Sequence, residues 1–205
     1  MSIGVTIREY GAPSLDKNEI LRYMRCKESS AEIDSLIDKT LLLAQNKLSY
    51  KVCYNKFPVS IKGNKLDLGF VTVESSDLKK CLVGCDEIIL FAATVGLEID
   101  RLIKRYGISE PSVSLCLQAI GSERVEALCD RFCHDLTREY EGVAILRPRF
   151  SAGYGDLPLS LQKNIFSALS CDKHIGITLN ESMIMSPSKS VTAIIGIKKV
   201  KNENS

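Results

Sequence analysis

The sequence predicts one α+β domain with a mixed, mostly antiparallel sheet and helices packed against it. Helical and strand periodicities are both present, but they do not alternate regularly along the chain. Regular alternation is typical of doubly wound parallel sheets, so its absence favours the α+β class. With 45% hydrophobic residues among 205, the chain can bury a substantial core. We find no internal repeat or linker.

The first part of the chain, residues 1–85, predicts two helices followed by strands. Ser14 precedes a short helix that contains Ile20, Leu21 and Met24. The segment 29–32 fits a capping box ahead of a longer amphipathic helix that runs to Leu48. Three strands and a short helix then follow, with a hairpin turn at Gly63-Asn64; they are predicted over residues 50–54, 58–62, 66–73 and 76–82.

The second part, residues 86–205, belongs to the same predicted domain and holds its longest helix. Pro111 is well placed in the first turn of this helix, which ends near Gly142. The next segment, 142–159, is rich in Gly, Pro, Arg and Ser and reads mostly as loop. Ser160 is expected to cap a helix that ends at Leu169. The other predicted elements are strands at 88–93, 175–179 and 191–197 and a helix at 97–106.

Bulk properties exclude several classes of function. The formal net charge is only +2, which does not predict a nucleic-acid-binding surface. The first residues have no signal-peptide pattern, and no apolar run approaches the ~20 residues that cross a bilayer. We therefore expect a cytoplasmic protein whose eight cysteines are reduced.

The loop from Arg147 to Pro158 is the most informative stretch. Arg149 offers a fork of donors for a carboxylate or phosphate. Gly153 and Gly155 allow the backbone to approach a ligand closely, and Tyr154 presents a ring between them. The stretch is also compatible with a simple turn before the next helix, so the residues alone leave both interpretations open.

Other constellations indicate neither a metal site nor a catalytic site. Cys81 and Cys85 supply two thiols. Cys129 and Cys133 lie on one face of a predicted helix, and His134 points away from that face. Zinc needs four ligands, so structural cysteines are the favoured interpretation. The nucleophile elbow Gly-x-Ser-x-Gly, the phosphate-binding P-loop and the dinucleotide fingerprint are all absent.

The sequence contains four motifs in this order: Phe91-Ala92-Ala93-Thr94-Val95-Gly96-Leu97-Glu98-x-Asp100, Glu123-Arg124-Val125-Glu126-Ala127-Leu128, Arg149-x-Ser151-x-Gly153-Tyr154-Gly155 and Asn180-Glu181-Ser182-Met183-x-Met185-x-Pro187-x-x-Ser190-Val191. Together they resemble the activation (reactivation) domain of cobalamin (vitamin B12)-dependent methionine synthase. The resemblance covers residues 88–197 and implies a free-standing version of the domain. The corrin-binding signature Asp-x-His-x-x-Gly is absent from the sequence, so the corrinoid would be carried by a partner protein.

The resemblance implies binding of S-adenosylmethionine and docking on a cobalamin-binding methionine synthase or related corrinoid protein. On that partner, one electron from a donor protein and the methyl group of S-adenosylmethionine would restore methylcobalamin. The domain would thus be a component of a methyltransferase in methionine biosynthesis. Arg149 would hold the ligand carboxylate, and the backbone at Ser151 and Gly153 would line the ligand. Tyr154 would lie between ligand and corrin, and Glu126 would face the ammonium or sulfonium.

Two alternatives remain open at this point. In the first, the chain keeps the fold but has a degenerate ligand site, and it acts only as an interaction module for a corrinoid protein. In the second, it is an unrelated small-molecule enzyme that uses Arg149, Asp156 and Glu126 for polar chemistry. A Glu126 that lies off the apolar stripe of its helix is also compatible with a simple solvated surface position.

Overall fold

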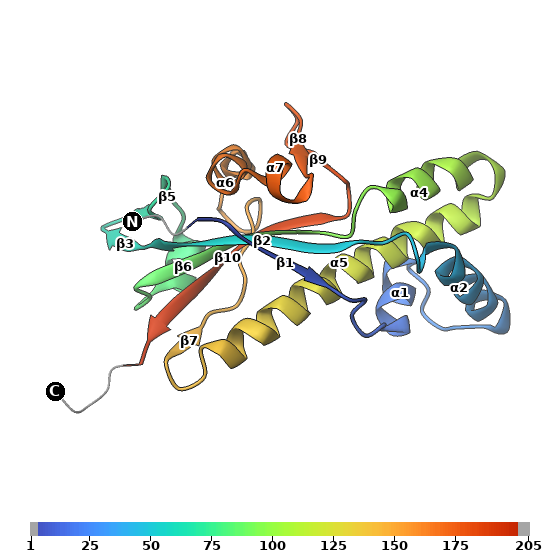
Figure 1. The fold of residues 1–205 in the computed structure, drawn as a ribbon, viewed down its shortest axis with the longest axis horizontal. Coiled ribbons are helices and arrows are strands. Elements are labelled where there is room, and N and C mark those ends of the chain that lie inside the picture. The colour runs from blue at the N-terminus through green and yellow to red at the C-terminus, as the bar shows by residue number, and fades with distance from the viewer. Residues whose placement is uncertain (1–3, 201–205) are drawn as a thin grey trace.

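The computed structural model describes residues 4–200 and shows a curved antiparallel sheet covered by helices on both faces (Figure 1). The main sheet has the strand order β1-β2-β6-β10-β7, and every neighbouring pair is antiparallel. Its strands are β1 (Thr6–Tyr10), β2 (Tyr50–Pro58), β6 (Glu87–Thr94), β7 (Ala144–Leu146) and β10 (Ser190–Lys199). The predicted α+β class with a mostly antiparallel sheet is therefore confirmed.

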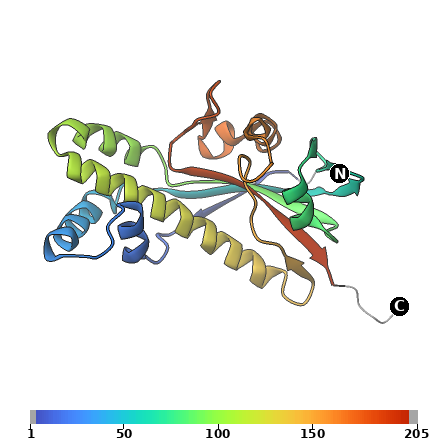
Figure 2. The ribbon, with the colours of Figure 1, turned by 180° about the vertical axis from the view of Figure 1, so that it is seen from behind.

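Helices cover the two faces of the sheet unequally. The long helix α5 crosses one face diagonally, as Figure 2 shows from behind, and three other helices pack around its first half. The opposite face carries three short helices, α3, α6 and α7, and the helical turn η1. The helices are α1 (Lys17–Tyr23), α2 (Ala31–Ala44), α3 (Ser76–Leu82), α4 (Glu98–Ser109), α5 (Pro111–Glu139), η1 (Leu159–Leu161), α6 (Gln162–Leu169) and α7 (Cys171–Ile175).

Strand β6 lies at the centre of the sheet because both of its faces are apolar. Its side chains alternate between two hydrophobic clusters, as the period of two in a strand requires. Ile89, Phe91 and Ala93 point toward α5, whereas Ile88, Leu90 and Ala92 point toward α6 and α7; all six are fully buried. Strands β2 and β10 pair with β6 over eight residues each, which protects its backbone polar groups.

Helix α5 begins and ends close to the predicted positions. Pro111 occupies the first turn, where its missing N–H costs nothing, and the helix ends at Glu139 with Tyr140 as its C-cap. The Phe132 ring packs between Tyr54 and Phe91, with ring centroids 5.2 and 5.0 Å away. This aromatic contact fixes the second half of α5 against β2 and β6.

The hairpin predicted at Gly63-Asn64 is confirmed, but the third predicted strand is wrong. The turn joins β3 (Ser60–Lys62) to β4 (Lys65–Asp67), and a second small strand, β5 (Thr72–Glu74), completes a three-stranded sheet. The predicted strand 66–73 is interrupted at Gly69, which has φ +78 and lies against Pro58. A residue with a side chain rarely adopts that conformation, so the chain turns there.

Several predicted element ends are corrected by the local hydrogen bonds. Asp16, not Ser14, caps α1, since its side chain accepts from the N–H groups of Asn18 and Glu19. Ser160 lies within η1 and makes no capping bond. The segment predicted as a strand at 175–179 instead ends α7 and begins β8 (Thr178–Leu179), which pairs with β9 (Met185–Ser186).

The two parts of the chain share one sheet, since β2 of residues 1–85 pairs with β6 of residues 86–205. The boundary at residue 85 stays a prediction. Within residues 4–200, no helix combines the length and the apolar character that crossing a membrane requires.

Candidate functional site

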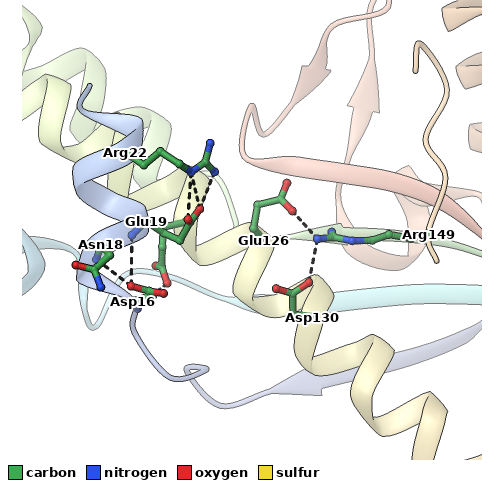
Figure 3. A network of polar contacts seen from close by, with 8 residues as sticks. Asp16, Asn18, Glu19, Arg22, Glu126, Asp130 and Arg149 are labelled. Atoms are coloured by element: carbon green, nitrogen blue, oxygen red, sulfur yellow. Dashed lines mark hydrogen bonds and ion pairs between the residues drawn. The ribbon is translucent and has the colours of Figure 1, made fainter. Parts of the chain in front are cut away.

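A polar groove of about 690 Å³ lies between α1 and the middle of α5. Its floor and one wall come from α5, the opposite wall comes from α1 and the segment before it, and Arg149 closes one end (Figure 3). Five carboxylates and three guanidinium groups line it: Asp16, Glu19, Glu123, Glu126, Asp130, Arg22, Arg131 and Arg149.

Arg149 is held at the groove by two carboxylates of α5. Its Nη2 donates to Glu126 Oε2 at 2.7 Å and to Asp130 Oδ1 at 2.9 Å. The Arg149 side chain is 26% exposed, that of Glu126 40% and that of Asp130 73%. Exposure to water therefore increases across this three-residue cluster, from the partly buried Arg149 through Glu126 to the exposed Asp130.

The local structure explains why these three residues meet. Glu126 and Asp130 are four residues apart on a helix, which places both side chains on one face. Phe150, the neighbour of Arg149, exchanges backbone hydrogen bonds of 2.8 Å in each direction with Ile194 of β10. This bridge fixes the backbone next to Arg149 at the sheet, so its side chain reaches across to α5.

The electrostatics of the groove favour a ligand that carries positive charge. Burial alone lowers the pKa of the Arg149 guanidinium, but Cys129, followed by Glu126 and Asp130, raises that pKa above its usual value. Arg149 therefore stays charged at neutral pH. The five lining carboxylates outnumber the three guanidinium groups, and they still do when Arg124, the partner of Glu123, is added as a fourth, so the lining is net negative.

The far wall of the groove is tied to α5 by a buried ion pair. Arg124 donates to the carbonyl oxygens of Pro13 and Ser14 at 2.8 and 2.7 Å and pairs with its neighbour Glu123. Glu123 Oε1 in turn accepts from the N–H of Asp16 at 3.0 Å. These bonds fix the segment that leads into α1.

Acidic side chains on that far wall are already engaged within α1. Asp16 caps the helix, and Glu19 pairs with Arg22 one turn later, with Nη2 and Oε2 2.6 Å apart. None of these α1 residues was singled out from the sequence, and Asp130 was not either. The only signal for Asp130 was its spacing of four residues from Glu126.

The loop after Arg149 is a compact turn whose backbone groups bond to one another. Gly153 N–H donates to Leu157 O at 2.9 Å, and Tyr154 N–H donates to Ser151 O at 3.2 Å. Gly153 has φ +87, and a Cβ there would lie 3.1 Å from Leu159 Cδ1. The shape of the turn itself thus requires glycine at position 153, whereas the close approach of a ligand there stays a prediction.

The structure brings together only some of the predicted site residues. Glu126 and Arg149 meet at the groove, whereas Ser151, Gly153 and Tyr154 follow along the loop and do not line it. The Tyr154 ring is 69% exposed and packs edge-on against Phe150, with centroids 5.4 Å apart. Its ring therefore faces outward.

Asp156 has a structural partner that separates it from the groove. Its carboxylate accepts from the Ser75 hydroxyl and from the N–H groups of Ser76 and Asp77, at 2.6 and 3.2 Å for the two backbone donors. The Ser75 hydroxyl, followed by these backbone donors, lowers the pKa of Asp156 below its usual value. An enzyme mechanism that combines Asp156 with Arg149 and Glu126 is not supported, because Asp156 is not a groove residue.

The cysteines lie in apolar or half-buried surroundings, and all eight are free thiols. Burial raises the pKa of Cys81 and of Cys85, which opposes the thiolate form that binds metals. Among residues 4–200, no group of three or more His, Cys, Asp or Glu side chains has an arrangement that could hold a metal ion.

Comparisons with known proteins agree with this fold. A family model described as "Vitamin B12 dependent methionine synthase, activation domain" matches residues 78–202. A solved structure titled "Crystal Structure of the MetH Reactivation Domain bound to AdoHcy" superimposes with a TM-score of 0.72 at 16% sequence identity. The alignment covers 99% of this chain and 81% of that chain. No curated protein matches the sequence.

The family match spans more than half of the chain, and it includes α5, the loop that begins at Arg149 and strand β10. The structural match extends over nearly the whole chain, so residues 4–77 also follow the fold of a reactivation domain. This chain belongs to the family of vitamin B12-dependent methionine synthase activation domains.

Proposed function

We propose that the chain binds S-adenosylmethionine in the groove between α1 and α5. One observation carries this: Arg149 and Glu126 lie side by side at the end of a groove whose lining is net negative. S-adenosylmethionine has one carboxylate and two cationic groups, the ammonium and the sulfonium. The guanidinium of Arg149 at the end of the groove complements the carboxylate, and the excess of carboxylates over guanidinium groups in the lining complements the two cationic groups.

Each predicted site residue has a defined task in this proposal. Arg149 holds the ligand carboxylate and Glu126 faces the ammonium or sulfonium. The backbone at Ser151 and Gly153 lies outside the groove and, in this proposal, lines only the part of the ligand that extends beyond Arg149 along the loop. The Tyr154 ring is exposed, and we assign it to the contact with the partner's corrin. When bound, S-adenosylmethionine supplies the methyl group.

The proposed partner is a cobalamin-binding methionine synthase or a related corrinoid protein in the cytoplasm. The chain would support the reductive remethylation of that partner's cobalamin, with the electron coming from a separate donor protein. This role positions reactants and leaves the methyl-transfer chemistry to the cofactors. Membership of the activation-domain family supports this role.

Calorimetry with S-adenosylmethionine tests the proposed site. Wild-type protein should bind saturably, and Arg149→Ala should weaken binding at least about 10-fold, since a charge-assisted pair contributes ~1.5–3 kcal/mol. Arg101→Ala, which removes an exposed ion-paired arginine on α4, is the matched control and should bind like wild type. Equal affinity of Arg149→Ala and wild type would refute the site.

The ion pairs of Arg149 favour one alternative, an interaction module with a degenerate ligand site. In that case Glu126 and Asp130 occupy the guanidinium permanently. The module would co-purify with a corrinoid protein and change its visible absorption spectrum without binding S-adenosylmethionine. The calorimetry described above therefore separates the two functions.

A further inference from the structure

The pairing of Arg149 has a consequence for any carboxylate that approaches it. A guanidinium has five N–H donors, and two of them are on Nη2. Both Nη2 hydrogens are used, one by Glu126 and one by Asp130, at 2.7 and 2.9 Å. These are the only hydrogen bonds that the Arg149 side chain makes within residues 4–200, so they leave Nε and Nη1 as its remaining donors.

Bidentate binding of a ligand carboxylate by Arg149 requires one of the two Nη2 hydrogens that Glu126 and Asp130 occupy. A guanidinium grips a carboxylate through two parallel hydrogen bonds, from Nη1 and Nη2 or from Nε and Nη2. Either arrangement uses an Nη2 hydrogen. Glu126 or Asp130 must therefore leave before Arg149 can bind a carboxylate in this way.

Asp130 is the residue that can leave at lower cost. Its side chain is 73% exposed, against 40% for Glu126, so water replaces the lost contact more easily. Asp130 and Arg149 are also the only residues shared between the groove and a second hollow of about 350 Å³ farther along α5. Their ion pair forms the border between the two spaces.

We propose that Asp130 gates the carboxylate site of the groove. Asp130 competes with the ligand carboxylate for one Nη2 hydrogen of Arg149, and it swings into solvent when the ligand binds. Glu126 stays on the second hydrogen and keeps the guanidinium oriented. The inference rests on the proposed function, because it takes the ligand carboxylate to bind at Arg149.

Asp130→Asn tests the gate, because a neutral amide is a weaker competitor for the guanidinium than a carboxylate. The variant should bind S-adenosylmethionine about two- to five-fold more tightly than wild type, the range set by the loss of an exposed ion pair. Asp130→Glu, which keeps the acid, should retain wild-type affinity. Thermal melting followed by circular dichroism verifies that each variant is folded.

Two controls separate competition at Arg149 from a change in overall charge. Decarboxylated S-adenosylmethionine keeps the sulfonium and the amine but has no carboxylate, so Asp130→Asn should not improve its binding. Asp135→Asn removes an acid that pairs with Arg131 on the same helix, and it should tighten neither ligand. A gain for both ligands with Asp130→Asn would indicate a general charge effect and overturn the gate.

The remaining outcomes also decide the proposal. If wild type binds and Asp130→Asn binds equally or more weakly, the gate is wrong while the proposed function stands. If only Asp130→Asn binds, the gate is supported in its strongest form. If neither protein binds S-adenosylmethionine, the proposed function and the gate both fail.

Discussion

Carboxylates of helix α5 take part in two arginine–carboxylate clusters that differ in exposure. In the first, Glu123 and Arg124 are only 3% and 5% exposed and hold the segment before α1 through its backbone. In the second, Arg149 bonds Glu126 and Asp130 at the open end of the groove. A buried charge pair is costly to break, whereas an exposed pair exchanges readily with water. The buried Glu123–Arg124 pair therefore stabilises the wall of the groove, whereas the exposed cluster leaves Arg149 able to bind a ligand.

The largest expected effect is on the buried pair. Arg124→Ala leaves the Glu123 carboxylate buried without its cation and should lower the free energy of unfolding by ~3–5 kcal/mol. Arg149→Ala should lower it by only about 1 kcal/mol or less, because both of its partners remain accessible to water when the guanidinium is removed. Urea denaturation followed by circular dichroism measures both values. A loss for Arg149→Ala as large as that for Arg124→Ala would mean that both clusters hold the fold.

Much of the fold could be predicted from the sequence, but the difference between the buried and the exposed arginine–carboxylate cluster could not. Helix α5 was found because Pro111 and its apolar period are local signals. Strand β7 lay hidden in a segment read as loop, because it is three residues long and sits at the sheet edge. The contact between Asp16 and Glu123 joins residues 107 positions apart, which no local pattern reveals.

The family resemblance predicts Glu126 and Arg149 as site residues, and the structure adds Asp130, which the resemblance does not include. The motif around Glu126 drew attention to α5, but an exposed acid such as Asp130 looks like any solvated helix position. Gly153 was read as room for a ligand, whereas its φ of +87 shows that the turn itself requires it. A glycine in a family motif can thus be explained by the backbone conformation of its turn before any ligand is considered.

Gly153→Ala sharpens the comparison, because Gly153 belongs to the loop that follows Arg149, whereas the Glu123–Arg124 pair is bonded to the segment before α1. The left-handed φ costs an alanine ~1–2 kcal/mol, and its Cβ would meet Leu159 Cδ1 at 3.1 Å. We expect lower stability by about that amount and weaker binding of S-adenosylmethionine. Urea denaturation and calorimetry measure the two effects.

Gly142→Ala is the control for that substitution. Gly142 has φ +74, but a Cβ there meets no atom within 4 Å. This substitution imposes similar backbone strain outside the loop and outside the groove, so it should lower stability without changing ligand affinity. Unchanged affinity of Gly153→Ala would show that the groove keeps Arg149 in place independently of the turn.

The smallest effect concerns Asp156, which anchors the far end of the same loop to α3. Its pKa is lowered mainly by the Ser75 hydroxyl, so its contribution to stability is present above the unfolded pKa of about 3.9. That contribution is lost as the pH falls through the lower, folded-state pKa. Asp156→Asn should therefore be less stable than wild type at neutral pH, and the difference should shrink below about pH 4. Urea midpoints measured across this range test the idea, and a difference that persists in acid would mean that the carboxylate charge does not anchor the loop.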